Sequence, residues 1–175
     1  MPAHPDSIAL GVAIATAADD VKAVDPAMYD VAEILGVVEA FVVVSATSAR
    51  QLDAIVDRIE EALRAEHGER PVRREGTPAS GWVLLDYGNV VVHVFLREQR
   101  AFYDLDRLFS DAAQHDPLTG EQVREMVAGA ADRDANQDVE LGVPGVVVMP
   151  RPDDADDHGG ADVGEGAADD QADRA

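Results

Sequence analysis

Two stretches in the first half of the chain have the apolar pattern of helices. The uncharged run over residues 8–18 predicts a first helix, with Asp6 or Ser7 as its N-cap. Its small apolar residues suit packing against a sheet. Ser48 and Gln51 have the spacing of a capping box, which predicts the start of another helix. The apolar face of that helix is expected to consist of Leu52, Ile55, Val56, Ile59 and Leu63.

Segments rich in β-branched residues predict strands. Residues 28–35 and 40–45 are expected to be interior strands. A short strand with a basic face is expected over residues 71–74, followed by a loop over residues 75–81. Residues 82–96 predict a β-hairpin, because two alternating apolar runs flank the two-residue turn Gly88-Asn89. Both faces of this hairpin are largely apolar, so each face needs a cover.

The chain after the hairpin is expected to return to helix. A last helix is expected over residues 98–110, with Tyr103 turned about 100° from Phe102. A short amphipathic helix is expected over residues 121–131, and residues 145–149 have the composition of a short strand or docking peptide. The inner stripe of the last helix is expected to comprise Ala101, Phe102, Leu105, Leu108 and Phe109.

The order of these elements predicts an α+β fold. The strand–helix–strand step over residues 40–74 suits a right-handed crossover, and the hairpin is antiparallel, so the sheet is expected to be mixed and flanked by helices. We expect a folded domain over residues 1–112 and an acidic, mostly disordered extension over residues 113–175. All eight aromatic residues lie in the former, and the latter has little apolar area to offset the entropy of ordering.

The charge of the chain limits its partners. Lys and Arg number 14 against 35 Asp and Glu, a formal net charge of −21. Residues 115–175 account for −12 (16 carboxylates and 4 arginines) and residues 1–114 for −9 (19 carboxylates and 10 basic residues). An acidic surface of this kind excludes coating of DNA or RNA through general phosphate neutralisation. The partner favoured by electrostatics is a basic surface.

No catalytic or metal-binding pattern stands out. The chain has no cysteine, its five histidines form no i,i+4 pair, and it lacks both phosphate-binding glycine motifs. Nucleotidyltransferases need two carboxylates just after the turn that here covers residues 45–50, and that turn has none. We therefore expect no metal, no cofactor and no enzymatic activity.

The apolar runs also lack the features of a secretory signal or membrane span, so we expect a cytoplasmic protein.

Several single residues allow two interpretations. His93 is either a hydrogen-bonded histidine of the sheet or a functional one. Asp86 is either bonded to turn amides or in contact with a partner. Trp82 is either a core residue or an interface anchor, and Tyr87 and Tyr103 add two amphipathic rings near it.

Ordered blocks over residues 41–51, 74–76, 82–95 and 102–109 closely resemble the ribosomal silencing factor (iojap-related) family. The most diagnostic block reads Trp-Val-Leu-Leu-Asp-Tyr-Gly and ends in His-Val-Phe. The resemblance covers about residues 5–112. Four positions depart from the family pattern: Ala40, Ala46, Asn89 and Phe109.

This resemblance implies a non-enzymatic factor that binds the large ribosomal subunit through its intersubunit-face protein numbered fourteen. It would block joining of the small subunit and damp translation in starvation. It also implies a nucleotidyltransferase-like fold without the catalytic carboxylates. The residues that it makes candidates for partner contact are Trp82, Leu84, Asp86, Tyr87, His93, Phe102 and Tyr103.

Two alternatives remain open on the sequence alone. One is a degenerate nucleotidyltransferase-like protein that still binds a nucleotide. The other is a homodimeric interaction module, because apolar character on both hairpin faces is compatible with self-association, and members of the family are thought to dimerise.

Overall fold

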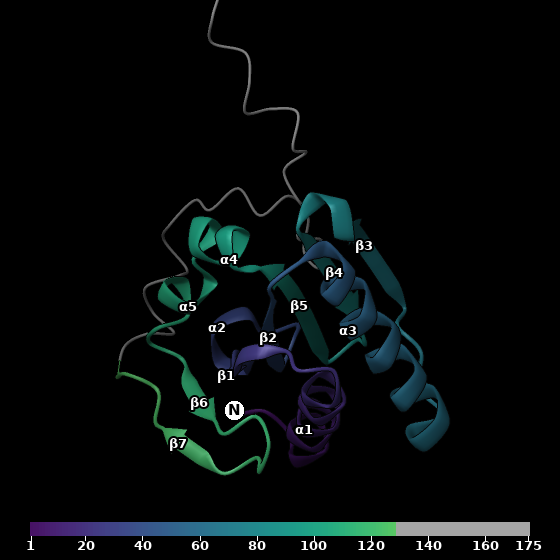
Figure 1. Cartoon of the computed structure of the whole chain (residues 1–175). Coiled ribbons are helices and arrows are strands. Elements are labelled where there is room, and N and C mark those ends of the chain that lie inside the picture. Colours follow the sequence, from purple (N-terminus) through teal and green to yellow (C-terminus); the bar gives the residue numbers. More distant parts are fainter. Residues whose placement is uncertain (129–175) are drawn as a thin grey trace, which may run out of the picture.

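A mixed β-sheet with helices on both faces forms the framework of the protein (Figure 1). The computed structural model describes residues 1–128. The strands are β1 (Val24–Asp30), β2 (Ala40–Ala46), β3 (Arg73–Thr77), β4 (Trp82–Asp86), β5 (Val90–Leu96), β6 (Ala113–His115) and β7 (Gln122–Arg124). The helices are α1 (Pro5–Asp20), α2 (Ala32–Leu35), α3 (Ala49–Ala62), α4 (Arg97–Tyr103) and α5 (Leu105–Leu108).

The order of the seven strands is β3-β4-β5-β2-β1-β6-β7. The central strands β2 and β5 are parallel, and every other neighbouring pair is antiparallel. The chain passes from β2 to β5 by way of α3, β3 and β4, so the α+β class and the mixed sheet are confirmed. Within residues 1–128, no helix is both long and apolar enough to cross a membrane.

Helices α1 and α3 cover one face of the sheet, where the side chains of Val42, Val44 and Val92 pack beneath them. The capping box predicted for α3 is half right. The Ser48 hydroxyl accepts from the backbone N–H of Gln51 (3.2 Å), but the Gln51 amide oxygen accepts from Thr47 N–H (2.8 Å). The helix then continues as a π-helical turn to His67 and ends at Gly68, whose φ of 70° is left-handed.

The opposite face carries the aromatic side chains. Pairing of β4 with β5 places Trp82 opposite Phe95 and Leu84 opposite His93, so these four residues share that face. The predicted alternation along the hairpin is therefore confirmed. The covers of this face are short: α2, α4, α5 and the residues that follow α5.

The expected first helix and first strands need correction. His4, rather than Asp6 or Ser7, caps α1, because its ring nitrogen accepts from Asp6 N–H (3.2 Å). The expected strand over residues 28–35 instead begins at residue 24 and ends at Asp30. The Asp30 carboxylate accepts from Ala32 N–H (3.1 Å), and this local bond favours the short helix α2 over further strand.

The basic strand expected over residues 71–74 begins later and is longer. It runs over Arg73–Thr77 and pairs with β4, so three residues of the expected loop belong to the sheet. Gly76, with φ of 80°, is accommodated within the strand. Tertiary pairing here outweighs the turn preference of the glycine.

The prediction of a single helix over residues 98–110 is wrong. Asp104 adopts a left-handed conformation (φ 50°) and divides the segment into α4 and α5. The break rotates the second half, so the expected inner stripe does not form: Phe102 is 80% exposed and Leu108 54% exposed, whereas Phe109 is buried. An exposed aromatic residue therefore stands beside a buried aromatic face.

The sheet also continues past the expected domain boundary at residue 112. Strand β6 pairs with β1, and β7 pairs with β6. The described part of the helix expected over residues 121–131 is strand and irregular chain, so that expectation is wrong there. The expected strand or peptide over residues 145–149 lies outside the described residues.

Candidate functional site

The aromatic face is centred on a pair of side chains from β4 and β5. The Trp82 indole Nε1–H donates to Nδ1 of His93 (3.2 Å). Both residues are buried, with 5% and 1% of their surface exposed. The Phe95 ring lies 4.8 Å from that of Trp82, centroid to centroid. Trp82 and His93 thus form part of the core.

His93 is held neutral by its surroundings. Burial lowers the pKa of the imidazole to about 3, because the charged form would lose its hydration. Since Nδ1 accepts from Trp82, the proton of the neutral ring is assigned to Nε2, and this atom has no hydrogen-bond partner among residues 1–128. The structure favours the structural interpretation of His93 at physiological pH.

Tyr103 and Phe102 connect this core to the surface. The Tyr103 ring lies 4.5 Å from Trp82 and partly covers it. Phe102 meets Tyr103 edge-on at 5.1 Å, and most of its ring points into solvent. A continuous series of ring contacts therefore runs from the buried indole to an exposed phenyl group.

A charged network fixes the two helices that carry these rings. Arg100 of α4 donates through Nε and Nη2 to the two carboxylate oxygens of Asp106 in α5 (2.9 and 2.8 Å). Tyr29 of β1 donates its hydroxyl to the same carboxylate (2.6 Å), and Arg100 also donates to the Ser45 hydroxyl (3.0 Å). The backbone carbonyl of Asp25 accepts a further bond from Arg100.

Within this network the pKa of Asp106 is lowered and that of Arg100 is raised, so both side chains stay charged. Hydrogen bonds from Arg100 lower the pKa of Asp106, although burial opposes this shift. Burial and the bond to Asp106 raise the pKa of Tyr29, so the phenol stays protonated. Arg100 therefore holds α4 and α5 against β1 and β2 with charge-assisted bonds.

The structure brings together five of the seven residues that the sequence singled out. Trp82, Leu84 and His93 are buried on the aromatic face, with Tyr103 over them and Phe102 exposed beside them. The other two lie elsewhere.

Asp86 and Tyr87 lie at the end of β4. The Asp86 carboxylate accepts from Gly88 N–H (2.7 Å), which is the turn-stabilising role. Tyr87 packs on the opposite face of the sheet with α1 and α3. Burial raises the pKa of its phenol, with smaller effects from Glu60 and Glu69. Neither residue joins the surface around Phe102.

Arg100 and Asp106 were not among the residues predicted to be functional. On one continuous helix, residues six positions apart do not face each other, so their spacing carried no signal. The break at Asp104 is what brings them together. A hint was present in Asp104 itself, since Asp tolerates the left-handed region better than most residues.

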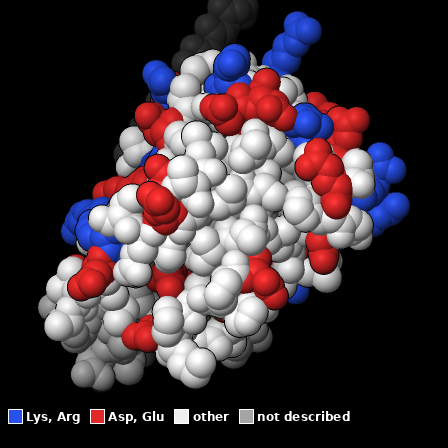
Figure 2. Space-filling model, turned by 90° about the horizontal axis from the view of Figure 1, so that it is seen from below, with Lys and Arg blue, Asp and Glu red and all other residues white. Residues whose placement is uncertain are grey.

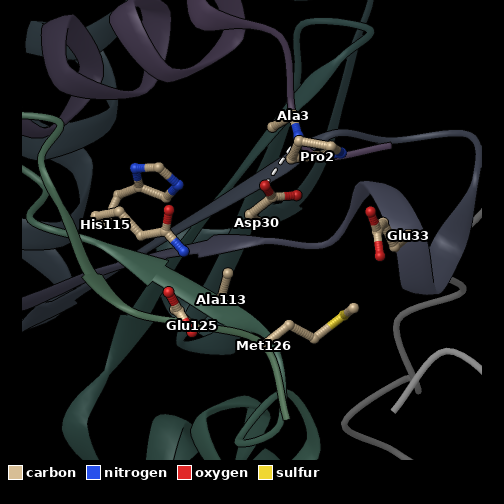
Figure 3. Close-up of a pocket in the computed structure, with 9 residues that line it drawn as sticks. Pro2, Ala3, Asp30, Glu33, Ala113, His115, Glu125 and Met126 are labelled. Carbon is tan, nitrogen blue, oxygen red and sulfur yellow. Dashed lines mark hydrogen bonds between the residues drawn. The ribbon is translucent and has the colours of Figure 1, made fainter. Parts of the chain in front are cut away.

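A pocket lies near the edge of the sheet formed by β6 and β7, apart from the aromatic face. The pocket has a volume of about 480 Å³. Figure 3 shows the residues that line it, from the N-terminal segment, β1, β6 and β7 among others. Both oxygens of Asp30 at its wall accept backbone N–H groups, those of Ala3 and Ala32. Glu33 and Glu125 also line it, so the pocket is acidic and none of the sequence-based candidates lies in it.

A second pocket lies beside Ser45, at the turn where a nucleotidyltransferase would need catalytic carboxylates. Three carboxylates, those of Asp25, Asp104 and Asp106, line it. Asp106 is bound by Arg100, however, and no group of three or more His, Asp or Glu side chains within residues 1–128 is arranged to hold a metal.

Comparisons with known proteins agree on one family. The family model described as "Ribosomal silencing factor during starvation" matches residues 4–141. Ribosomal silencing factor RsfS of Bacillus subtilis is 37% identical over 98 residues, which cover 56% of this chain and 82% of the relative. The chloroplastic protein Iojap of Arabidopsis thaliana is 35% identical over 109 residues. That match covers 62% of this chain and 45% of the relative, so the chain spans less than half of Iojap.

Two solved structures have a fold similar to that of this chain. A crystal structure of a protein from Chromobacterium violaceum matches with a TM-score of 0.56 at 29% identity, over 71% of this chain and 95% of that one. A crystal structure from Bacillus halodurans matches with a TM-score of 0.51 at 31% identity, over 60% of this chain and 94% of that one.

Proposed function

The chain belongs to the ribosomal silencing factor family, and on that premise we propose that it represses translation by occupying the large ribosomal subunit. The contact would be with the intersubunit-face protein numbered fourteen. A factor bound there prevents joining of the small subunit by steric exclusion. The repression of translation, the ribosomal partner and the action during starvation are all part of what we propose.

The observation that carries the proposal is the exposed Phe102 on a rigid support. Solvent covers 80% of its surface, while Tyr103 and Trp82 pack in series behind it. Arg100 and Asp106 fix the helices on either side of Asp104. Aromatic side chains that are exposed but held in place are typical anchors of protein interfaces, because little side-chain entropy is lost on binding.

The charge of the domain supports a protein contact rather than an RNA contact. Residues 1–114 carry −9, which opposes close approach to rRNA phosphates but favours a basic protein surface. Arg70, Arg73 and Arg74 are exposed and could still touch an occasional phosphate. We therefore propose a basic protein as the main partner.

Co-sedimentation of the full chain with purified large subunits tests the proposal. We expect the chain to travel with free large subunits and not with assembled ribosomes. Phe102→Ala should weaken binding by about ten-fold, or roughly 1–2 kcal/mol, through loss of an interface anchor. Val72→Ala is the matched control, since Val72 is 77% exposed and lies just before β3. Equal binding of both variants would contradict the assigned contact.

A homodimeric module is the second candidate, supported by a different surface. Helix α1 has no charged residue between Asp6 and Asp19, and Figure 2 shows a broad uncharged area on the face seen from below, where α1 lies. Light scattering of the free chain tests this candidate. A dimer mass that Ala9→Asp, at an exposed position of α1, reduces to a monomer mass would support it, and a monomer mass at all concentrations would contradict it.

A further inference from the structure

Helices α4 and α5 present both apolar and basic groups to solvent. Phe102 is 80% exposed and Leu108 is 54% exposed. Arg97 and Arg107 are exposed as well, and neither forms an ion pair with another residue of the described chain. Because residues 97–110 hold three arginines and three acids, this segment is neutral in a domain that carries −9 over residues 1–114. We define Arg97, Phe102, Arg107 and Leu108 as the α4–α5 surface.

The described chain ends close to this surface. Val127 N–H donates to the backbone carbonyl of Asp111 (2.9 Å), three residues after the end of α5. Arg124 donates through Nη2 to the carbonyl of Ala112 (3.2 Å). Residue 128 thus leaves the domain on the side where α5 ends, and not at the far edge of the sheet where β3 lies.

The remaining sequence contains one apolar stretch. Residues 141–150 are free of charge, and residues 146–149 read Val-Val-Val-Met. After Arg151 and Pro152 comes a strongly acidic run, with carboxylates at positions 153, 154, 156 and 157. An apolar group followed by carboxylates is chemically complementary to two apolar side chains flanked by free arginines.

We propose that residues 145–157 dock on the α4–α5 surface of the same chain. Residues 145–149 contact Phe102 and Leu108, and the carboxylates of residues 153–157 pair with Arg97 and Arg107. The 17 residues from 128 to 145 span up to about 60 Å when extended, which is ample for this distance. Tethering gives the segment an effective concentration on the order of 1 mM, so a weak contact suffices.

Docking of the segment has a consequence for regulation. Phe102 is also the anchor assigned to the ribosomal partner, so the docked segment and the ribosome would compete. This consequence rests on the proposed function. The docking itself does not, because it occurs in the free chain and is measured without ribosomes.

Disulfide trapping in the full-length chain tests the docking, since the protein has no cysteine of its own. Ala101→Cys places a thiol on exposed α4, and Val147→Cys places one in the segment. Under mild oxidation we expect an intramolecular disulfide, seen as a monomer that loses both free thiols. The rate should exceed that of the pair Ala54→Cys with Val147→Cys by about ten-fold, because Ala54 is exposed on α3 across the sheet.

Substitutions in the segment supply the second control. Adding Val146→Asp and Val148→Asp should reduce the trapping rate to that of the Ala54 pair, whereas Val163→Asp should leave it unchanged. Equal rates for the Ala101 and Ala54 pairs would overturn the proposal. A covalent dimer in place of the crosslinked monomer would also overturn it, because the occupant would then be a second copy of the chain.

Discussion

At the scale of residues, neighbouring aromatic side chains have different roles. Trp82 and His93 are almost fully buried and bonded to each other, so they build the core. Phe102 is exposed and makes its ring contact with Tyr103. The sequence could not separate these roles, because a tryptophan in an apolar strand and a phenylalanine in a helix each suit a core or an interface.

Unfolding in urea should separate Trp82 from Phe102. We expect Trp82→Ala to lower the free energy of unfolding by about 3–5 kcal/mol, since it leaves a cavity among His93, Phe95 and Tyr103. Phe102→Ala should change it by no more than about 0.5 kcal/mol, as is usual for exposed side chains. Similar losses for both variants would place Phe102 in the core and contradict its proposed role as a contact.

The buried His93 should make stability depend on pH. Its pKa is about 3 in the folded chain and near 6.5 when exposed, so between these values only the unfolded state binds the extra proton. The free energy of unfolding should therefore rise with pH across this window and be fully restored above pH 6.5, with a contribution of about 1.4 kcal/mol per pH unit.

His93→Gln keeps an acceptor for Trp82 but removes the titrating group. We expect the slope of unfolding free energy between about pH 4.5 and 6 to fall by about 1.4 kcal/mol per pH unit in this variant. His67→Gln is the control, since His67 is exposed at the end of α3. An unchanged slope in His93→Gln would show that His93 is not buried in neutral form.

At the scale of elements, prediction succeeded where a long periodic pattern met a clear boundary signal. Helix α3 and the hairpin of β4 and β5 have both, and they formed largely as expected. The three-residue strands β6 and β7 are too short for a period to show. The break at Asp104 is accompanied by bonds from Arg100 to β1 and β2, and local pattern cannot reveal contacts between distant segments.

The link between Arg100 and Asp106 should control the order of α4 and α5. Asp106→Asn removes the charge from a carboxylate that accepts from both Arg100 and Tyr29. We expect a loss of about 1–2 kcal/mol in stability, limited by partial exposure to solvent, and faster hydrogen exchange over residues 97–108.

The matched control for this link is Asp104→Asn. Asn tolerates the left-handed conformation, and Asp104 has no ion pair with another residue in the range 1–128. This variant should leave hydrogen exchange over residues 97–108 unchanged. If both variants exchange alike, the pair of Arg100 and Asp106 does not hold the helices.

At the scale of the whole molecule, the charge belongs to two different parts of the chain. Of the total of −21, residues 115–175 contribute −12 and residues 1–114 contribute −9. The overall value excludes an RNA-coating protein, but it does not exclude a partner on the ribosome that is itself a basic protein. The α+β class could be predicted because the main elements are strongly periodic. The edge strands beyond residue 112, and the division of the candidate residues between core and surface, required the three-dimensional structure.

A subunit-joining assay tests the central claim most directly. Purified large and small subunits are mixed at raised magnesium, and light scattering records formation of whole ribosomes. We expect the full chain, incubated first with large subunits, to reduce joining in a dose-dependent manner, with Phe102→Ala requiring about ten-fold more protein and Val72→Ala acting like the unaltered chain. Normal joining at concentrations at which the chain is bound to large subunits would contradict the account.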